Sequence, residues 1–230
     1  MYILSCNSFN VCYGKAEEIL TAGVLNSDAK YIIAQTHFRR TDEIARLLEL
    51  GFCFHDRCLR LEVATDRTKK YCSERGGRAN DIFVCETEAF TDEMLELALT
   101  AFDTDRRFFL DRDFVPLERA FEVIRAYIAH YRKGPHKIIK AVHRGEVLGY
   151  VILHEIENGV YENVLGLTKQ NLMGKVAAIP LYSSALGMIG AEGKQYLGIA
   201  SSSNAASINL HMRLGAKVTD TLDRYILRKC

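Results

Sequence analysis

Three side chains in the last third of the chain could move a proton. His211 falls on a predicted helix, and Glu155 and Glu162 fall on two successive predicted strands. A histidine can donate a proton near neutral pH and a carboxylate can accept one, so these groups could act as general acid and base. His154 is a further candidate base, although alternation along a strand puts it and Glu155 on opposite faces. The competing interpretation of each residue is a side chain without a catalytic role.

A glycine-bearing stretch of the same region has the pattern of a phosphate-binding strand–turn–helix unit. Apolar alternation at Leu165 and Leu167 predicts a strand, and apolar spacing from Leu181 onward predicts a helix. The turn predicted at 173–178 lies between them. Because a helix start presents free backbone N–H groups and the positive end of a dipole, we expect the main-chain amides of 174–179 to form an open cup for a diphosphate. The alternative is an ordinary strand–helix connection.

The region after this unit resembles the closing element of a known family. Asn204 stands at a predicted helix start, where asparagine is a favoured cap, and Gly215 stands where that helix must turn left-handed into the last strand. The element is the N-x-x-A-x-x-L-Y-x-x-x-G-F pattern of GNAT acyl-CoA N-acyltransferases. The residues that carry the resemblance are Asn204, Ala205, Ala206, Leu210, His211, Leu214, Gly215, Ala216 and Val218. The resemblance implies an α/β fold with a mixed sheet and acetyl-CoA as the acyl donor.

The same resemblance implies which residues hold the cofactor. The strand before the turn is expected to splay from its neighbour, so that the backbone of Leu165, Gly166 and Leu167 pairs with the pantetheine arm and the acetyl carbonyl. The turn departs from the family pattern, because Val176 replaces the usual inner glycine and Met173 the usual Gln or Arg. The residues implied around the diphosphate and at the next helix cap are Met173, Gly174, Lys175, Val176, Ala177, Ala178, Ile179 and Asn204.

The family's reaction is a direct attack of an amine on the thioester, with no covalent enzyme intermediate. His211 takes the position of the family's tyrosine, the usual proton donor to the departing thiolate. Tyr182, on the helix after the turn, is a second possible donor. Glu155, Glu162, His154 or a chain of water molecules would accept the proton of the amine.

A charged and aromatic stretch resembles one subgroup of the family. Residues 101–114 are similar to the R-F-x-x-D-x-x-F segment of dTDP-fucosamine acetyltransferases, which acetylate the 4-amine of a nucleotide-linked deoxysugar. The resemblance implies that Arg106 or Arg107 holds a nucleotide phosphate, which a planar guanidinium does well. Ion pairs between these arginines and aspartates of the same stretch are the alternative. Amino acids, polyamines and antibiotics remain open as acceptors.

The first third of the chain resembles its end. Residues 30–63 and 195–227 both follow the order strand, helix, Leu-Gly, strand, and Asp56 aligns with Asp220. We therefore expect an internal repeat of a strand–helix–strand unit.

The repeat suggests a GNAT fold with a truncated amino-terminal lobe. We expect a partial GNAT-like lobe without a cofactor turn at 1–75 and a complete GNAT acyltransferase domain at 81–230. The charged stretch 66–80, which contains two adjacent glycines, is the expected linker. In the first lobe we expect a strand at 2–4 and a helix at 15–25.

Composition argues against several other classes of function. A formal charge of +1 argues against a broad nucleic-acid surface, and we expect no membrane span, because no apolar run approaches the ~18 residues that one needs. The seven cysteines form no C-x-x-C pair, which indicates reduced thiols and no metal site. We expect a cytoplasmic enzyme, monomeric or homodimeric, that binds a small-molecule amine and no nucleic acid or membrane. The competing hypothesis is a degenerate GNAT-fold binding or partner module without acetyl transfer.

Overall fold

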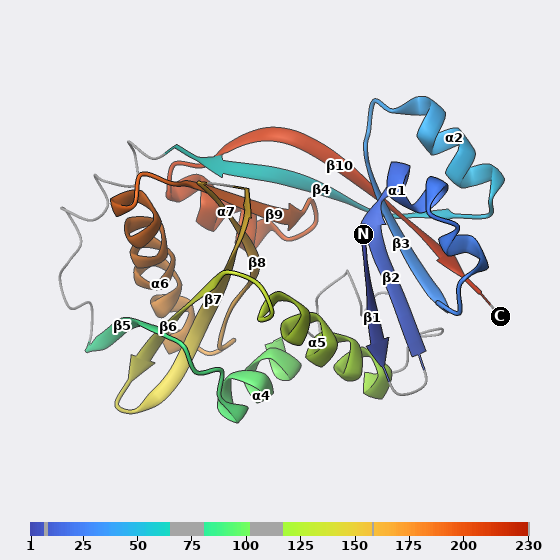
Figure 1. Ribbon diagram of the computed structural model, residues 1–230. Helices are drawn as coiled ribbons and strands as arrows, with labels where there is room; N and C mark the ends of the chain where they lie inside the picture. The colour runs from blue at the N-terminus through green and yellow to red at the C-terminus, as the bar shows by residue number, and fades with distance from the viewer. Residues whose placement is uncertain (7–8, 65–80, 102–116, 158, 230) are drawn as a thin grey trace.

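The structure is a computed structural model that describes residues 1–6, 9–64, 81–101, 117–157 and 159–229. Its strands form one ten-stranded mixed sheet in the order β1-β2-β3-β10-β4-β9-β8-β7-β6-β5 (Figure 1). The strands are β1 (Tyr2–Cys6), β2 (Phe9–Lys15), β3 (Tyr31–His37), β4 (Cys53–Val63), β5 (Ile82–Thr87), β6 (His136–His143), β7 (Glu146–Glu157), β8 (Val160–Thr168), β9 (Gln195–Ser201) and β10 (Lys217–Arg228). The helices are α1 (Ala16–Thr21), the 3-10 helix η1 (Val24–Asn26), α2 (Thr41–Glu49), α4 (Asp92–Ala101), α5 (Leu117–Tyr131), α6 (Leu172–Ala191) and α7 (Ala205–Arg213).

Alternation along β7 separates two layers of the core. Tyr150 and Ile152 pack with side chains of α4 and α5 on one face of the sheet, whereas Val151 and Leu153 pack with α6 on the other. A third cluster joins α1 and α2 to β3 in the amino-terminal part of the sheet. Groups from α4 and α6 can therefore meet only where neighbouring strands separate.

The internal repeat is visible in the sheet. β3-α2-β4 and β9-α7-β10 have the same element order, and α2 and α7 are each nine residues long. Their four strands lie in the order β3-β10-β4-β9, with antiparallel pairing throughout. Exchanging β3 with β9 and β4 with β10 gives the same order read from the other end of the sheet. The two units are therefore related by an approximate two-fold axis.

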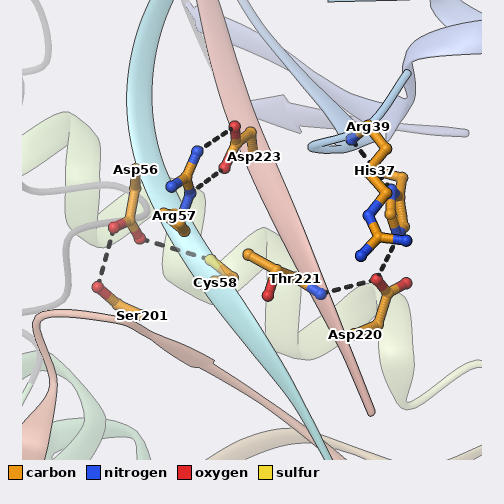
Figure 2. A network of polar contacts seen from close by, with 9 residues as sticks. All are labelled: His37, Arg39, Asp56, Arg57, Cys58, Ser201, Asp220, Thr221 and Asp223. Carbon is orange, nitrogen blue, oxygen red and sulfur yellow. Dashed lines mark hydrogen bonds and ion pairs between the residues drawn. The ribbon is translucent and has the colours of Figure 1, made fainter. Parts of the chain in front are cut away.

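The two predicted lobes share one sheet, because a strand of the second lobe is inserted between two strands of the first. β10, which belongs to the region expected at 81–230, lies between β3 and β4 of the region expected at 1–75 (Figure 1). Side chains also link β4 to β10. Arg57 of β4 donates two hydrogen bonds, of 2.7 and 2.9 Å, to the carboxylate of Asp223 on β10 (Figure 2). The linker expected at 66–80 lies outside the described residues.

The amino-terminal elements differ in part from the prediction. The expected strand at 2–4 is present as β1, but the strand β2 was not predicted. The helix expected at 15–25 is shorter, because α1 ends at Thr21 and Gly23 then adopts a φ of +64° before η1. A left-handed residue cannot continue an α-helix, which explains the early end.

α6 requires two corrections. It begins at Leu172, so the turn predicted at 173–178 is part of the helix. It is also long and apolar enough to cross a membrane by length and composition, with a mean hydropathy of 1.4 over 18 residues, so the statement that no apolar run approaches this length was wrong. Half of that window is buried inside the protein, including Leu181, Ala185 and Ile189 in the core against the sheet. A buried core helix passes the same test.

Candidate active site

β8 and β9 are paired at one end and separate at the other. Their parallel pairing runs through four residue pairs and ends at Asn163 and Gly198. Beyond this point β8 continues beside β7, and β9 continues beside β4. A register shift between β7 and β8 makes Val164 a bulged residue where the separation begins. The backbones of two central strands therefore border an open wedge.

A cavity of about 700 Å³ occupies this wedge, which is an ordinary volume for a small-molecule site. Its walls come from β8, β9, α6 and α7, together with Ala101 at the end of α4 and Arg224 on β10. Because α4 and α6 lie on opposite faces of the sheet, the cavity passes between the strands from one face to the other.

The charged side chains that line the cavity are basic. They are Lys169, Lys175, Arg213 and Arg224, and within the described chain no Asp or Glu is among the lining residues. Lys169 pairs with Glu146 and Arg224 with Asp56, and neither acidic residue lines the cavity. The cavity therefore suits an anionic ligand.

The start of α6 differs from the predicted phosphate cup. The Asn171 Oδ1 accepts a hydrogen bond of 2.8 Å from the Gly174 N–H, and the Asn171 carbonyl accepts one of 3.1 Å from the Lys175 N–H. The amides that follow lie inside the helix, where each bonds to the carbonyl four residues earlier. A Cβ on Gly174 would stand 2.0 Å from the Lys169 carbonyl oxygen, so a close backbone approach requires glycine here. The prediction of an open cup at 174–179 is wrong, because the helix begins at Leu172.

The predicted cofactor residues divide between the cavity and the core. Three of those on α6 line the cavity, and they are Lys175, Ala178 and Ile179. Of the other four, Met173, Val176 and Ala177 pack in the core against the sheet, and Gly174 is buried against the backbone of Lys169.

On β8, Gly166 and Leu167 line the cavity, whereas Leu165 packs with the core on the side of α4 and α5. Asn204 caps α7 as expected, since its Oδ1 accepts a hydrogen bond of 3.0 Å from the Ser207 N–H, and it also lines the cavity.

His211 lies at the cavity wall with its ring almost fully buried. Its Nδ1 is 2.8 Å from the Ser207 carbonyl oxygen, which can only accept, so Nδ1 carries the proton. Burial lowers the pKa of His211, and in the resulting neutral ring Nε2 accepts a hydrogen bond of 2.8 Å from the Tyr196 hydroxyl. The Tyr196 oxygen in turn accepts one of 3.0 Å from the Asn163 amide. A role for His211 as proton donor stays a prediction, and here its proton is bound to a backbone carbonyl.

Tyr182 of α6 reaches into the wedge. A Cβ on Gly166 would lie 2.0 Å from the Tyr182 Oη, so only glycine leaves room for this hydroxyl. Burial raises the pKa of Tyr182 to about 12, while a hydrogen bond with Asn163 acts in the opposite direction. At neutral pH Tyr182 therefore presents a protonated hydroxyl to β8 just past the separation point.

The predicted proton acceptors lie outside the cavity lining. Glu155 is ion-paired with Lys194 at 3.0 Å, and this contact lowers the pKa of Glu155. Glu162 lies opposite Leu197 in the parallel part of the β8–β9 pair, before the strands separate. Burial lowers the pKa of His154, whose ring packs edge-on against the ring of Tyr131. A role as base stays a prediction for all three residues.

A polar cluster flanks the cavity where β4, β9 and β10 meet (Figure 2). Asp56 accepts a hydrogen bond of 3.0 Å from the Ser201 Oγ, and the Arg224 Nη1 lies 3.7 Å from its other carboxylate oxygen. In the repeat-related half of the cluster, the His37 Nε2 lies 2.6 Å from the Asp220 Oδ1. The same shift of 164 positions relates Asp56 to Asp220 and His37 to Ser201. The two aspartates that align in the sequence repeat, Asp56 and Asp220, therefore take equivalent places in this polar cluster.

Some residues of the cavity were not anticipated. Arg224 and Asn163 line the cavity, and Tyr196 hydrogen-bonds to His211 behind its wall. These three residues have no local signal, because each is a single polar residue on a strand whose neighbours are set by the sheet order. The predicted substrate ligands Arg106 and Arg107 lie outside the described residues.

The chain matches no family model and no curated protein. It does match solved structures. One is a conserved protein of unknown function from Staphylococcus epidermidis, with a TM-score of 0.59 and 12% identity over 96% of this chain and 85% of that one.

Two further structures are GNAT proteins. The tandem GNAT protein from the clavulanic acid biosynthesis pathway has a TM-score of 0.59 and 12% identity, over 93% of this chain and 68% of its own. A GCN5-related N-acetyltransferase from Kribbella flavida has a TM-score of 0.55 and 12% identity, over 94% and 79%. At these identities the likeness shows the fold, and this chain has the GNAT fold built on one mixed sheet.

Proposed function

We propose that this protein transfers an acetyl group from acetyl-CoA to the primary amine of a small acceptor. The observation that carries the proposal is the basic cavity of about 700 Å³ in the wedge between β8 and β9. The likeness in fold to N-acetyltransferases supports the same class of reaction.

Two features of the cavity suit acetyl-CoA. Lys175 and Arg213 would face its phosphates, since they come from the two helices that border the wedge. Gly166 and Leu167 would run beside the pantetheine arm, because in the described part of the chain β8 has no strand partner on this side past Asn163. Bound acetyl-CoA would supply the thioester carbonyl that the amine attacks.

In the transfer, a bond forms between the amine nitrogen and the acetyl carbon, and the carbon–sulfur bond breaks. A thiol has an intrinsic pKa near ~8.5, well below the value of about 12 for Tyr182, so Tyr182 would stabilise the departing thiolate by donating a hydrogen bond. The proton lost by the amine would pass to water, because no carboxylate is among the lining residues described. His211 stays the alternative donor.

The acceptor is the finer part of the proposal. The sequence resemblance gives a nucleotide-linked amino sugar, bound through Arg106 or Arg107, as one candidate acceptor, and amino acids, polyamines and antibiotics are the others. A panel of amines that includes such a sugar, assayed for release of free thiol from acetyl-CoA, would identify the acceptor.

The second candidate function is a binding or partner module that no longer uses acetyl-CoA. It is favoured by one observation, the occupation of the Gly174 N–H by the side chain of Asn171. A calorimetric and thermal-shift titration with acetyl-CoA separates the two functions. For the transferase we expect saturable binding, and at about 100 times the Kd the free energy of unfolding should rise by ~2.7 kcal/mol. No stabilisation at millimolar acetyl-CoA would leave only the module.

A further inference from the structure

Arg224 lines the cavity on the face of the sheet opposite α6. Its side chain is buried, with a relative exposure of 3% for the residue. Ile226, two residues along β10, packs in the core with α4 and α5. The pairing of β10 with β3 is continuous here, and the register shift on the β4 side adds a residue to β4 and none to β10, so Arg224 shares the face of Ile226. Lys175 contributes its charge from α6 on the other face. Arg224 therefore places a basic side chain across the wedge from the proposed phosphate contacts on α6.

The internal repeat shows that the fold does not require a buried arginine at this position. Arg60 is related to Arg224 by the shift of 164 positions, and it stands opposite Asp220 as Arg224 stands opposite Asp56. The side chain of Arg60 is nevertheless 39% exposed and pairs with Glu62 at 3.0 Å. The burial of Arg224 at the cavity wall is thus specific to its side of the junction.

We propose that Arg224 binds the carboxylate of the acetyl acceptor, so that the acceptor is an amine that also carries a carboxylate, as amino acids do. The proposal rests on the proposed function for the identity of the reaction. A guanidinium offers two parallel N–H donors that match the two oxygens of a carboxylate. An acceptor held in this way would direct its amine toward the wedge and Gly166.

The charges nearby favour a carboxylate over a phosphate. Asp56 lies 3.7 Å from the guanidinium of Arg224 and is itself 5% exposed. A carboxylate adds one negative charge to this pair, whereas a phosphate near neutral pH adds up to two beside the buried Asp56 carboxylate. Repulsion between like charges in a buried site disfavours the second arrangement.

The test compares amino acids with the amines that result from their decarboxylation. Suitable pairs are alanine with ethylamine, phenylalanine with phenethylamine, and lysine with cadaverine, with a nucleotide-linked amino sugar as a further arm. Thiol release from acetyl-CoA gives kcat/KM, and calorimetry in the presence of CoA gives binding without turnover. We expect at least one amino acid to exceed its amine by about 10- to 100-fold, the usual effect of a hydrogen-bonded charge.

Two variants and one matched control locate the effect. Arg224→Gln should lower kcat/KM for the amino acid at least tenfold more than for its amine, mainly through KM. Arg224→Lys keeps a positive charge beside Asp56, which guards against misfolding, and should restore part of the preference. Arg60→Gln changes the repeat-related arginine outside the cavity and should leave the preference intact. Thermal unfolding of each variant checks that it is folded.

The outcomes separate this proposal from the function on which it rests. If acetyl-CoA binds and amines react with no preference for amino acids, or if Arg224→Gln lowers both members of a pair equally, the carboxylate site is refuted and the transferase stands. If amino acids bind in an Arg224-dependent way but no transfer occurs, the carboxylate site stands and the transferase fails. Preference for the nucleotide-linked sugar over every amino acid also refutes the site.

Discussion

The cap of α6 gives the sharpest prediction, because its removal should change stability and cofactor affinity in opposite directions. In Asn171→Ala the Gly174 N–H loses its 2.8 Å hydrogen bond to the side chain. Loss of an asparagine cap typically costs about 0.5–2 kcal/mol. For a chain of 230 residues, a loss of about 1 kcal/mol corresponds to a fall in Tm of ~2–4 °C.

The affinity of Asn171→Ala for acetyl-CoA should rise while its stability falls. The freed amide would stand at the positive end of the α6 dipole, beside Lys175, where a diphosphate could accept its hydrogen bond. A hydrogen bond to a charged group contributes about 1.5–3 kcal/mol. We therefore expect acetyl-CoA to bind Asn171→Ala about 10- to 100-fold more tightly than it binds the wild type.

Calorimetry with acetyl-CoA and thermal unfolding of the free protein measure the two effects on the same samples. Thr91→Ala removes a comparable contact, the 3.4 Å hydrogen bond from the Met94 N–H to the Thr91 hydroxyl at the start of α4, and Thr91 is not among the lining residues of the cavity. This control should therefore lose stability without any gain in affinity. If Asn171→Ala loses stability and its affinity does not rise, the start of α6 is not where the phosphates bind, and the reasoning is refuted.

Two further variants test the buried network beside the wedge. Tyr182→Phe should lower kcat about 10- to 100-fold with a similar KM for acetyl-CoA, because it removes one hydrogen bond to the leaving sulfur; unchanged kcat in the acetyl-transfer assay would exclude Tyr182. The pKa of buried His211 is lowered on folding, so the unfolded state binds its proton more readily, and stability present above about pH 6.5 is lost as the pH falls. His211→Gln should therefore show a shallower loss of unfolding free energy between pH 7 and 5 in denaturant titrations, and an equally steep loss would contradict the neutral, buried ring. The same variant should keep kcat within a few fold of the wild type if His211 only positions Tyr196, whereas a loss of ~10²–10⁴-fold would restore it as the proton donor.

Local sequence signals predicted most of the elements. The repeated unit was recognisable because its helices end at Leu-Gly pairs, and Gly51 and Gly215 both adopt the positive φ that such an ending needs. Asn204 was recognised as a cap for a similar reason, since it precedes an apolar helical pattern. The start of α6 was misplaced although Asn171 gave the same signal. The family resemblance directed attention to Gly174 as the residue of a turn, when its role is to allow close contact with Lys169.

The candidate site depended on contacts that no local pattern contains. Glu155 was a reasonable candidate base on a strand, and only the fold shows that Lys194 pairs with it away from the cavity. The place of Arg224 at the cavity cannot be predicted from local sequence, because it depends on β10 lying between β3 and β4.

The sequence by itself determined where the helices and most strands lie, because periodicity, caps and left-handed glycines act over a few residues. The tertiary structure decided the order β3-β10-β4-β9, the wedge at Asn163 and Gly198, and the basic residues gathered around it. The physical reason is the separation along the chain of the residues that interact. Which strands pair is settled by the burial of apolar faces and by pairs such as Arg57 with Asp223, which join residues 166 positions apart.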